Sequence, residues 1–96
     1  MATFVSLVSF TDQGIRNVKD TTTRFEAFRA MASTLGVNVL SVYWTVGTHD
    51  LVLTLEGTDE AVTTALLKVG TLGNVRTQTL RAFSIDEMKR IVAAIP

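Results

Sequence analysis

The residues best suited to acid–base chemistry stand side by side between two predicted strands. His49 is the only histidine of the chain, and Asp50 follows it directly. An imidazole oriented by a carboxylate can act as a general base near neutral pH. Aspartate is also common in turns, because its carboxylate accepts hydrogen bonds from nearby backbone. Two interpretations therefore stand: a candidate catalytic pair, or a histidine beside a structural aspartate.

Tyr43, Arg76 and Arg81 are candidates for binding a small molecule. Tyr43 and Trp44 are neighbours in a predicted strand, so they point to opposite faces, and each also suits a core or an interface. Arg76 and Arg81 lie an odd number of positions apart on the last predicted strand, hence on opposite faces, and do not form one anion clamp. A buried arginine there would suit a carboxylate, whereas an exposed one is a solvated or salt-bridged side chain.

Several other kinds of site lack the residues they need. Without cysteine there is no disulfide, thiolate metal site or cysteine nucleophile, and one histidine with scattered carboxylates does not make a zinc or iron site. The segment Gly70–Asn74 follows a predicted helix and enters a strand, the reverse of a phosphate loop, so it predicts a helix stop and a turn. No serine stands in a nucleophile-elbow pattern. We expect neither a cofactor nor a metal.

Length and composition predict one small soluble domain over residues 1–96. Of 96 residues, 47% are hydrophobic, which suffices for a single core. Nine basic residues balance nine acidic ones, so the chain lacks the positive charge typical of nucleic-acid binding. Met1–Phe10 alternates apolar and polar residues without a basic leader, unlike a signal peptide or a membrane span. We expect a cytoplasmic protein that binds neither nucleic acid nor membrane.

Apolar periodicity predicts the order of the elements. Strands are expected over residues 3–10, 37–46, 51–56 and 75–83, and a hairpin turn over 47–50. Helices are expected over 21–35, 57–69 and 84–95, where apolar residues recur at helical spacing, with one helical turn at 15–18 after a break at 11–14. Gly36 is a natural helix stop, and Ser84 with Glu87 matches a capping box.

This order is the βαββαβ pattern of an α+β, ferredoxin-like fold, a four-stranded antiparallel sheet with helices on one face, followed here by a C-terminal helix. Leu53 is expected to face the helices. In the strand 37–46 both faces are expected to be buried, with one side formed by Val37, Val39, Tyr43 and Thr45 and the other by Leu40, Val42, Trp44 and Val46.

Apolar residues on both faces of the sheet predict that the chain associates with itself. The last helix can cover only part of the open face, which is centred on the strands that carry Tyr43, Val52 and Thr79. Leaving the rest in water would expose a large apolar patch, so a second copy is expected to cover it, sheet against sheet. The sequence thus predicts a homo-oligomer, at least a dimer.

Three segments carry a resemblance to a known family: residues 11–20, residues 47–50 and residues 71–83. Through these segments, the sequence resembles the GYD-domain family over the whole chain. The resemblance implies a small bacterial or archaeal protein with a ferredoxin-like fold, similar to the dimeric α/β-barrel proteins, whose biochemical role is not established. His49 stands where the family has the tyrosine of its name, and the resemblance supplies no catalytic residues.

Three functional hypotheses follow. The first is a small-molecule-binding or accessory protein, whose oligomer forms apolar pockets edged by Tyr43, His49 and an arginine of the last strand, Arg76 or Arg81. The second is a cofactor-free enzyme of the isomerase or monooxygenase type, with His49 as general base. The third is a purely structural oligomer subunit.

Overall fold

A computed structural model describes all residues from 1 to 96. Its elements are β1 (Ala2–Phe10), α1 (Asp12–Arg16), the short 3-10 helix η1 (Val18–Asp20), α2 (Thr21–Thr34), β2 (Asn38–Trp44), β3 (Leu51–Gly57), α3 (Asp59–Thr71), β4 (Val75–Ala82) and α4 (Ile85–Ala93). The predicted succession of strands and long helices is confirmed. No helix combines the length and the apolar character that crossing a membrane would need.

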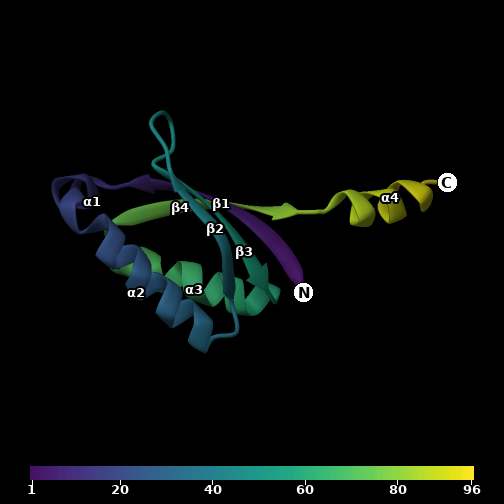
Figure 1. Cartoon of the computed structure of the whole chain (residues 1–96), viewed down its shortest axis with the longest axis horizontal. Coiled ribbons are helices and arrows are strands. Elements are labelled where there is room, and N and C mark those ends of the chain that lie inside the picture. The colour runs from purple at the N-terminus through teal and green to yellow at the C-terminus, as the bar shows by residue number, and fades with distance from the viewer.

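The four strands form one antiparallel sheet in the order β2-β3-β1-β4. This arrangement is consistent with a ferredoxin-like fold and confirms the predicted α+β class. Helices α2 and α3 lie along the same side of the sheet, as Figure 1 shows, and no helix of the chain covers the other side. The two sides are called the helix face and the open face below.

The core lies between the helix face and α2 with α3. Alternate residues of β3 point into it, and Leu53 is only 4% exposed, which confirms its predicted direction. From α2, Phe25 and Phe28 pack against these strands, and from α3, Val62 and Ala65 do the same. The apolar stripes predicted for both helices therefore form one core.

A β-bulge in β2 changes one predicted face. Val39 pairs with Leu55 and Ser41 with Thr54, so Leu40 is the extra residue between them. An extra residue shifts the alternation by one position. Val39 consequently lies on the helix face, and its predicted place on the same side as Tyr43 is wrong.

Beyond the bulge, the predicted alternation holds. Tyr43 pairs with Val52 on the open face, whereas the ring of Trp44 packs edge-on against Phe25 of α2 with 5.7 Å between centroids. The prediction that both sides of this strand are buried is wrong for the single chain, because Tyr43 is 69% exposed and Leu40 is 54% exposed.

Residues around the first turn are more helical than predicted. Thr11 follows β1 and caps α1, since its hydroxyl accepts a hydrogen bond from the Gly14 main-chain N–H at 3.1 Å. The predicted break at residues 11–14 is therefore a helix start. Gly36 is the predicted stop of α2, with φ of 80° in the left-handed region.

Helix α4 stands apart from the rest of the chain. Its capping box is confirmed, with Ser84 and Glu87 each accepting the other's main-chain N–H. Figure 1 shows α4 beyond the end of β4, well away from the sheet, and none of its residues is buried. The expectation that the last helix covers part of the open face is wrong for this chain, because β4 runs on outward instead of turning back.

Candidate functional site

His49 and Asp50 lie in the turn between β2 and β3 without forming a pair. The Asp50 Oδ2 atom accepts a hydrogen bond from the Phe10 main-chain N–H at 2.7 Å. The His49 Nδ1 atom lies 3.4 Å from the Ser9 Oγ atom, which is long for a hydrogen bond. The Asp50 carboxylate thus binds backbone and does not orient the imidazole. A catalytic role for His49 stays a prediction.

The two arginines of β4 lie on opposite faces, as predicted. Arg76 pairs with Ser9 on the open face, whereas Arg81 pairs with Phe4 on the helix face. The Arg81 guanidinium lies 4.4 Å from the centroid of the Phe83 ring and donates a hydrogen bond to the Thr3 carbonyl. Both arginines are exposed, and they belong to different sites.

One end of the open face collects three polar residues that are far apart in the sequence: Ser9, His49 and Arg76. Sequence reasoning did not bring Ser9 to this group, because only the pairing of β1 with its neighbours places it there. Tyr43 lies on the same face and is mostly exposed. Ligand binding by Tyr43, Arg76 or Arg81 stays a prediction.

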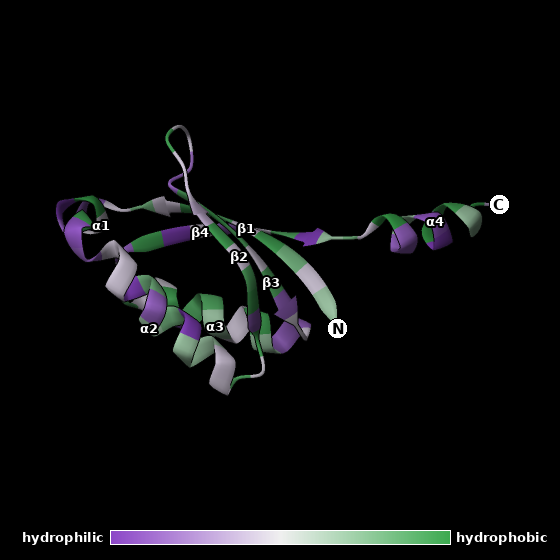
Figure 2. Ribbon diagram, in the orientation of Figure 1, coloured by the Kyte–Doolittle hydropathy of each residue, from purple (hydrophilic) through white to green (hydrophobic).

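The centre of the open face is uncovered and carries no charge, with apolar residues around the polar Ser41, Thr54 and Gln78. It carries Tyr43 on β2, Val52 on β3, Val5 and Leu7 on β1, and Leu80 on β4. Tyr43 is 69% and Leu80 47% exposed. Figure 2 shows hydrophobic stretches along the strands and further ones on α4. Two apolar surfaces, the open face and one side of α4, thus have no partner within the chain.

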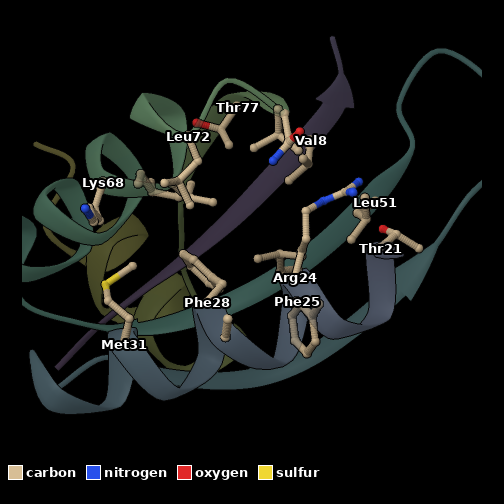
Figure 3. Close-up of a pocket in the computed structure, with 16 residues that line it drawn as sticks. Val8, Thr21, Arg24, Phe25, Phe28, Met31, Leu51, Lys68, Leu72 and Thr77 are labelled. Atoms are coloured by element: carbon tan, nitrogen blue, oxygen red, sulfur yellow. The ribbon is translucent and has the colours of Figure 1, made fainter. Parts of the chain in front are cut away.

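A pocket opens on the opposite side of the sheet, between α2 and α3. Its volume is about 220 Å³, and 11 of its 16 lining residues are hydrophobic. Figure 3 shows Phe25, Phe28 and Met31 along α2 on one side of the pocket, with Lys68, Leu72 and Val8 across from them. None of the side chains predicted for a site lines this pocket.

Sequence reasoning did not predict this pocket, because several of its residues belong to an apolar helix stripe of the kind that forms a core. Phe25, Phe28 and Met31 recur at helical spacing, and that pattern predicts a core face. Only the separation between α2 and α3 leaves part of this stripe facing empty space. No sequence signal reports the distance between two helices.

A network of hydrogen bonds fixes the turn at one end of the pocket. The Thr11 hydroxyl donates to the Gly73 carbonyl at 2.6 Å, and the Thr11 main-chain N–H donates to the Asn74 carbonyl at 3.0 Å. The Gln13 side-chain amide donates to the Leu72 carbonyl at 3.1 Å and to the Asn74 Oδ1 atom at 2.9 Å. Because Leu72 and Asn74 line the pocket, this network positions part of its wall.

The charge along the pocket has one sign. Arg24 and Lys68 line it, and no carboxylate does. The Arg24 guanidinium donates to the Asn17 carbonyl at 2.6 Å and to the Gly14 carbonyl at 3.3 Å. Neither cation has an acidic partner, since the only ion pair of the chain joins Arg29 to a glutamate on the outer side of α2.

Two pKa values are shifted, and both shifts arise on exposed surface. The hydrogen bond and the charge of Glu26 raise the pKa of Arg29. Hydrogen bonds from the Ser84 backbone and side chain lower the pKa of the Glu87 carboxyl. The first shift reflects the ion pair on α2. The second reflects the capping box at the start of α4.

Comparisons with known proteins cover nearly the whole chain. The family model described as GYD domain matches residues 4–92. A Thermus thermophilus protein named glutamine synthetase and cystathionine beta-lyase binding protein is 31% identical over 90 residues, which is 92% of this chain and 95% of the relative. A crystal structure of a protein from the same species matches this chain with a TM-score of 0.55 and 26% sequence identity. The match covers 88% of this chain and 95% of the chain in that structure.

Proposed function

Because this chain belongs to the GYD-domain family, we propose that it is a homodimeric accessory protein that binds another protein. Its open face forms the dimer, and α4 reaches over the second copy. The observation that carries this proposal is the pair of uncovered apolar surfaces, on the sheet and on α4.

The size of the exposed surface supports a dimer. The chain exposes 6314 Å², whereas a folded monomer of its mass exposes roughly 5,400 Å² by the usual scaling. The radius of gyration is 14.6 Å, against about 12.5 Å for a compact domain of this length. The projecting α4, which has no buried residue, contributes to this excess, so the chain has surface available for an interface of roughly 800 Å² per partner.

The centre of the open face is free of charged side chains, as interface cores are. It carries Tyr43, Val52 and Leu80, while Arg76 and Glu56 lie toward the ends of the strands. Two sheets that pack face to face bury such residues at a spacing of about 10 Å. A two-fold axis would bury the same patch on both copies.

Helix α4 extends this interface. Its apolar side chains recur at three- and four-residue spacing, at Ile85, Met88, Ile91 and Val92, and Ile95 follows just after the helix. Between 43% and 78% of each of these residues is exposed. An arm with a fully formed capping box and an exposed apolar stripe is suited to lie on a second copy.

Light scattering on the purified chain tests the dimer. We expect about twice the chain mass of 10.5 kDa, because the apolar face needs cover. Leu80→Lys should give the single-chain mass by placing a charge on the open face, and Ile91→Glu should weaken the dimer through α4. Leu67→Lys on the outer side of α3 is the control and should stay dimeric, since Leu67 is already 67% exposed. A wild-type mass near 10.5 kDa would contradict the dimer.

The relative's name supplies the first partners to test. We expect glutamine synthetase or cystathionine beta-lyase from the organism that makes this chain to co-elute with it in size-exclusion chromatography. An unrelated enzyme of similar size serves as control. Absence of co-elution with both enzymes, from a chain that scatters as a dimer, would reject this partner class while leaving the dimer in place.

A further inference from the structure

We infer that the pocket between α2 and α3 is a binding site for a small monocarboxylate with an apolar tail, with Arg24 as the residue that binds the carboxylate. This site lies on the helix face, across the sheet from the proposed dimer interface, and does not depend on it.

The size of the pocket defines the tail. Its volume is about 220 Å³, and a dry cavity of roughly 150 Å³ already accepts benzene. Phe25, Phe28, Leu66 and Val75 line the space with apolar carbon. One aromatic ring with a short side arm, or an aliphatic chain of similar bulk, matches this volume and lining.

The charge of the lining defines the head group. Arg24 and Lys68 bring two positive charges and no lining residue is acidic, so an anion is attracted and a cation repelled. Figure 3 shows these two side chains on different sides of the pocket, so a single carboxylate meets one of them. Arg24 is the better partner, because it is half-buried while Lys68 is exposed.

The contacts of Arg24 fix its guanidinium beside the pocket. Two main-chain carbonyls, of Asn17 and Gly14, hold its terminal nitrogens at 2.6 and 3.3 Å. These partners are neutral, so they leave its charge uncompensated, and guanidinium N–H groups remain for a carboxylate. A guanidinium held in this way loses little conformational freedom when an anion binds.

Phenylpropionate is the probe, and phenylpropanol is its uncharged analogue. In NMR titrations of the full chain, we expect phenylpropionate to shift the resonances of Phe25, Phe28 and Leu66, and to bind at least about tenfold more tightly than the alcohol. Equal affinities, no saturable shift at millimolar concentration, or shifts confined to the open face would each overturn the inference.

Variants separate a binding role of Arg24 from a structural one. Arg24→Gln should reduce the affinity for phenylpropionate to within about threefold of that for the alcohol, because Lys68 still contributes its charge, whereas Arg24→Lys should retain most of the preference for the acid. Lys68→Gln, which leaves the hydrogen bonds of Arg24 intact, should weaken binding of the acid about twofold to threefold by removing a nearby charge. Lys89→Gln on α4 is the matched control and should change nothing. Should Arg24→Gln fail to fold, an unchanged affinity in Lys68→Gln would count against the charged site.

A blocking variant tests the position of the site without touching its charges. Ala27 is exposed and lines the pocket, so Ala27→Phe places a ring at the opening. Ala30 is exposed on the same helix and does not line the pocket, which makes Ala30→Phe the matched control. We expect the first variant to lose binding of phenylpropionate and the second to keep it. Equal binding by both variants would place the ligand elsewhere.

Discussion

The Asp50 carboxylate accepts the main-chain N–H of Phe10 at 2.7 Å, although the only imidazole of the chain belongs to the adjacent residue. The backbone adds to this link, because the Asp50 N–H donates to the Val8 carbonyl and the Asp50 carbonyl accepts from the Thr45 N–H. Asp50 therefore ties the β2–β3 turn to the end of β1. This geometry gives the aspartate a structural role.

Removal of that carboxylate should destabilise the fold. Asp50→Ala leaves the Phe10 N–H without its acceptor, and we expect a loss of about 1.5 to 3 kcal/mol in the free energy of unfolding. Asp50→Asn keeps an acceptor oxygen and should lose less. His49→Ala is the control and should change stability by less than about 0.5 kcal/mol. Denaturant titration measures all three, and an Asp50→Ala loss no larger than that of His49→Ala would remove the structural role.

Gly14 should not tolerate a side chain. A Cβ atom there would lie 1.9 Å from the Asn74 carbonyl oxygen, and backbone on both sides prevents either segment from yielding. We expect Gly14→Ala to destabilise the chain by about 3 kcal/mol or more, the upper end for overpacking. Gly70→Ala in α3 is the matched variant, because a Cβ there meets nothing within 4 Å. It should stabilise the chain by about 0.5 to 1 kcal/mol. Thermal unfolding of both variants would show whether their effects have opposite signs.

Leu53 reports on the core. Its side chain is 4% exposed and belongs to the main apolar cluster. Leu53→Ala should lower the free energy of unfolding by about 2 to 5 kcal/mol through lost burial and a cavity. Leu67→Ala, at a position that is 67% exposed, should cost less than about 0.5 kcal/mol. A Leu53→Ala loss below about 1 kcal/mol would mean that this strand faces the other way.

The start of α4 should respond to acid. The pKa of the Glu87 carboxyl lies below its ordinary value of 4.5, because the Ser84 backbone and side chain hydrogen-bond to it in the folded chain. A lowered folded pKa means that the ionised form stabilises the helix above the ordinary pKa, and that this contribution is lost as the pH falls through the folded value. We expect α4 to fray over that window below the ordinary value of 4.5.

NMR detects this change at the Ser84 amide, which donates to the Glu87 carboxylate at 2.9 Å. Glu87→Gln retains an acceptor without a titrating proton, so its Ser84 resonance should stay constant in that window. Asp86→Asn removes the adjacent carboxylate and should leave the wild-type titration in place. A Ser84 resonance that titrates identically in wild type and Glu87→Gln would exclude Glu87 as the cause.

Local chemistry allowed the elements of this fold to be predicted from the sequence. The capping box at Ser84 and Glu87 needs only two residues at a fixed spacing, and it is present. Gly36 ends α2 because glycine adopts a positive φ at low cost. Leu53 faces the helices because alternation along a strand is fixed by backbone geometry.

Predictions failed where a feature depended on how elements meet. The bulge at Leu40 moved Val39 to the helix face, because pairing with β3 decides where an extra residue is absorbed. Helix α4 projects outward, although its apolar stripe is equally suited to the chain's own sheet. For Asp50, the sequence left a catalytic and a structural interpretation open, and it could not name Phe10 as the partner, because β1 lies beside that turn only in the folded sheet.

The family, the α+β class, the order of the elements and the apolar residues on both faces of the sheet could be predicted from the sequence. Family motifs, periodicity, capping and turn chemistry are local patterns that act over a few residues. Which charged side chains line the pocket depends on how α2 and α3 pack in the folded chain. Arg24 and Lys68 lie far apart in the chain and carry no motif, yet the separation between α2 and α3 places both on one apolar pocket. Cavities and their charges arise from distances between packed elements, and local spacing along a chain does not encode those distances.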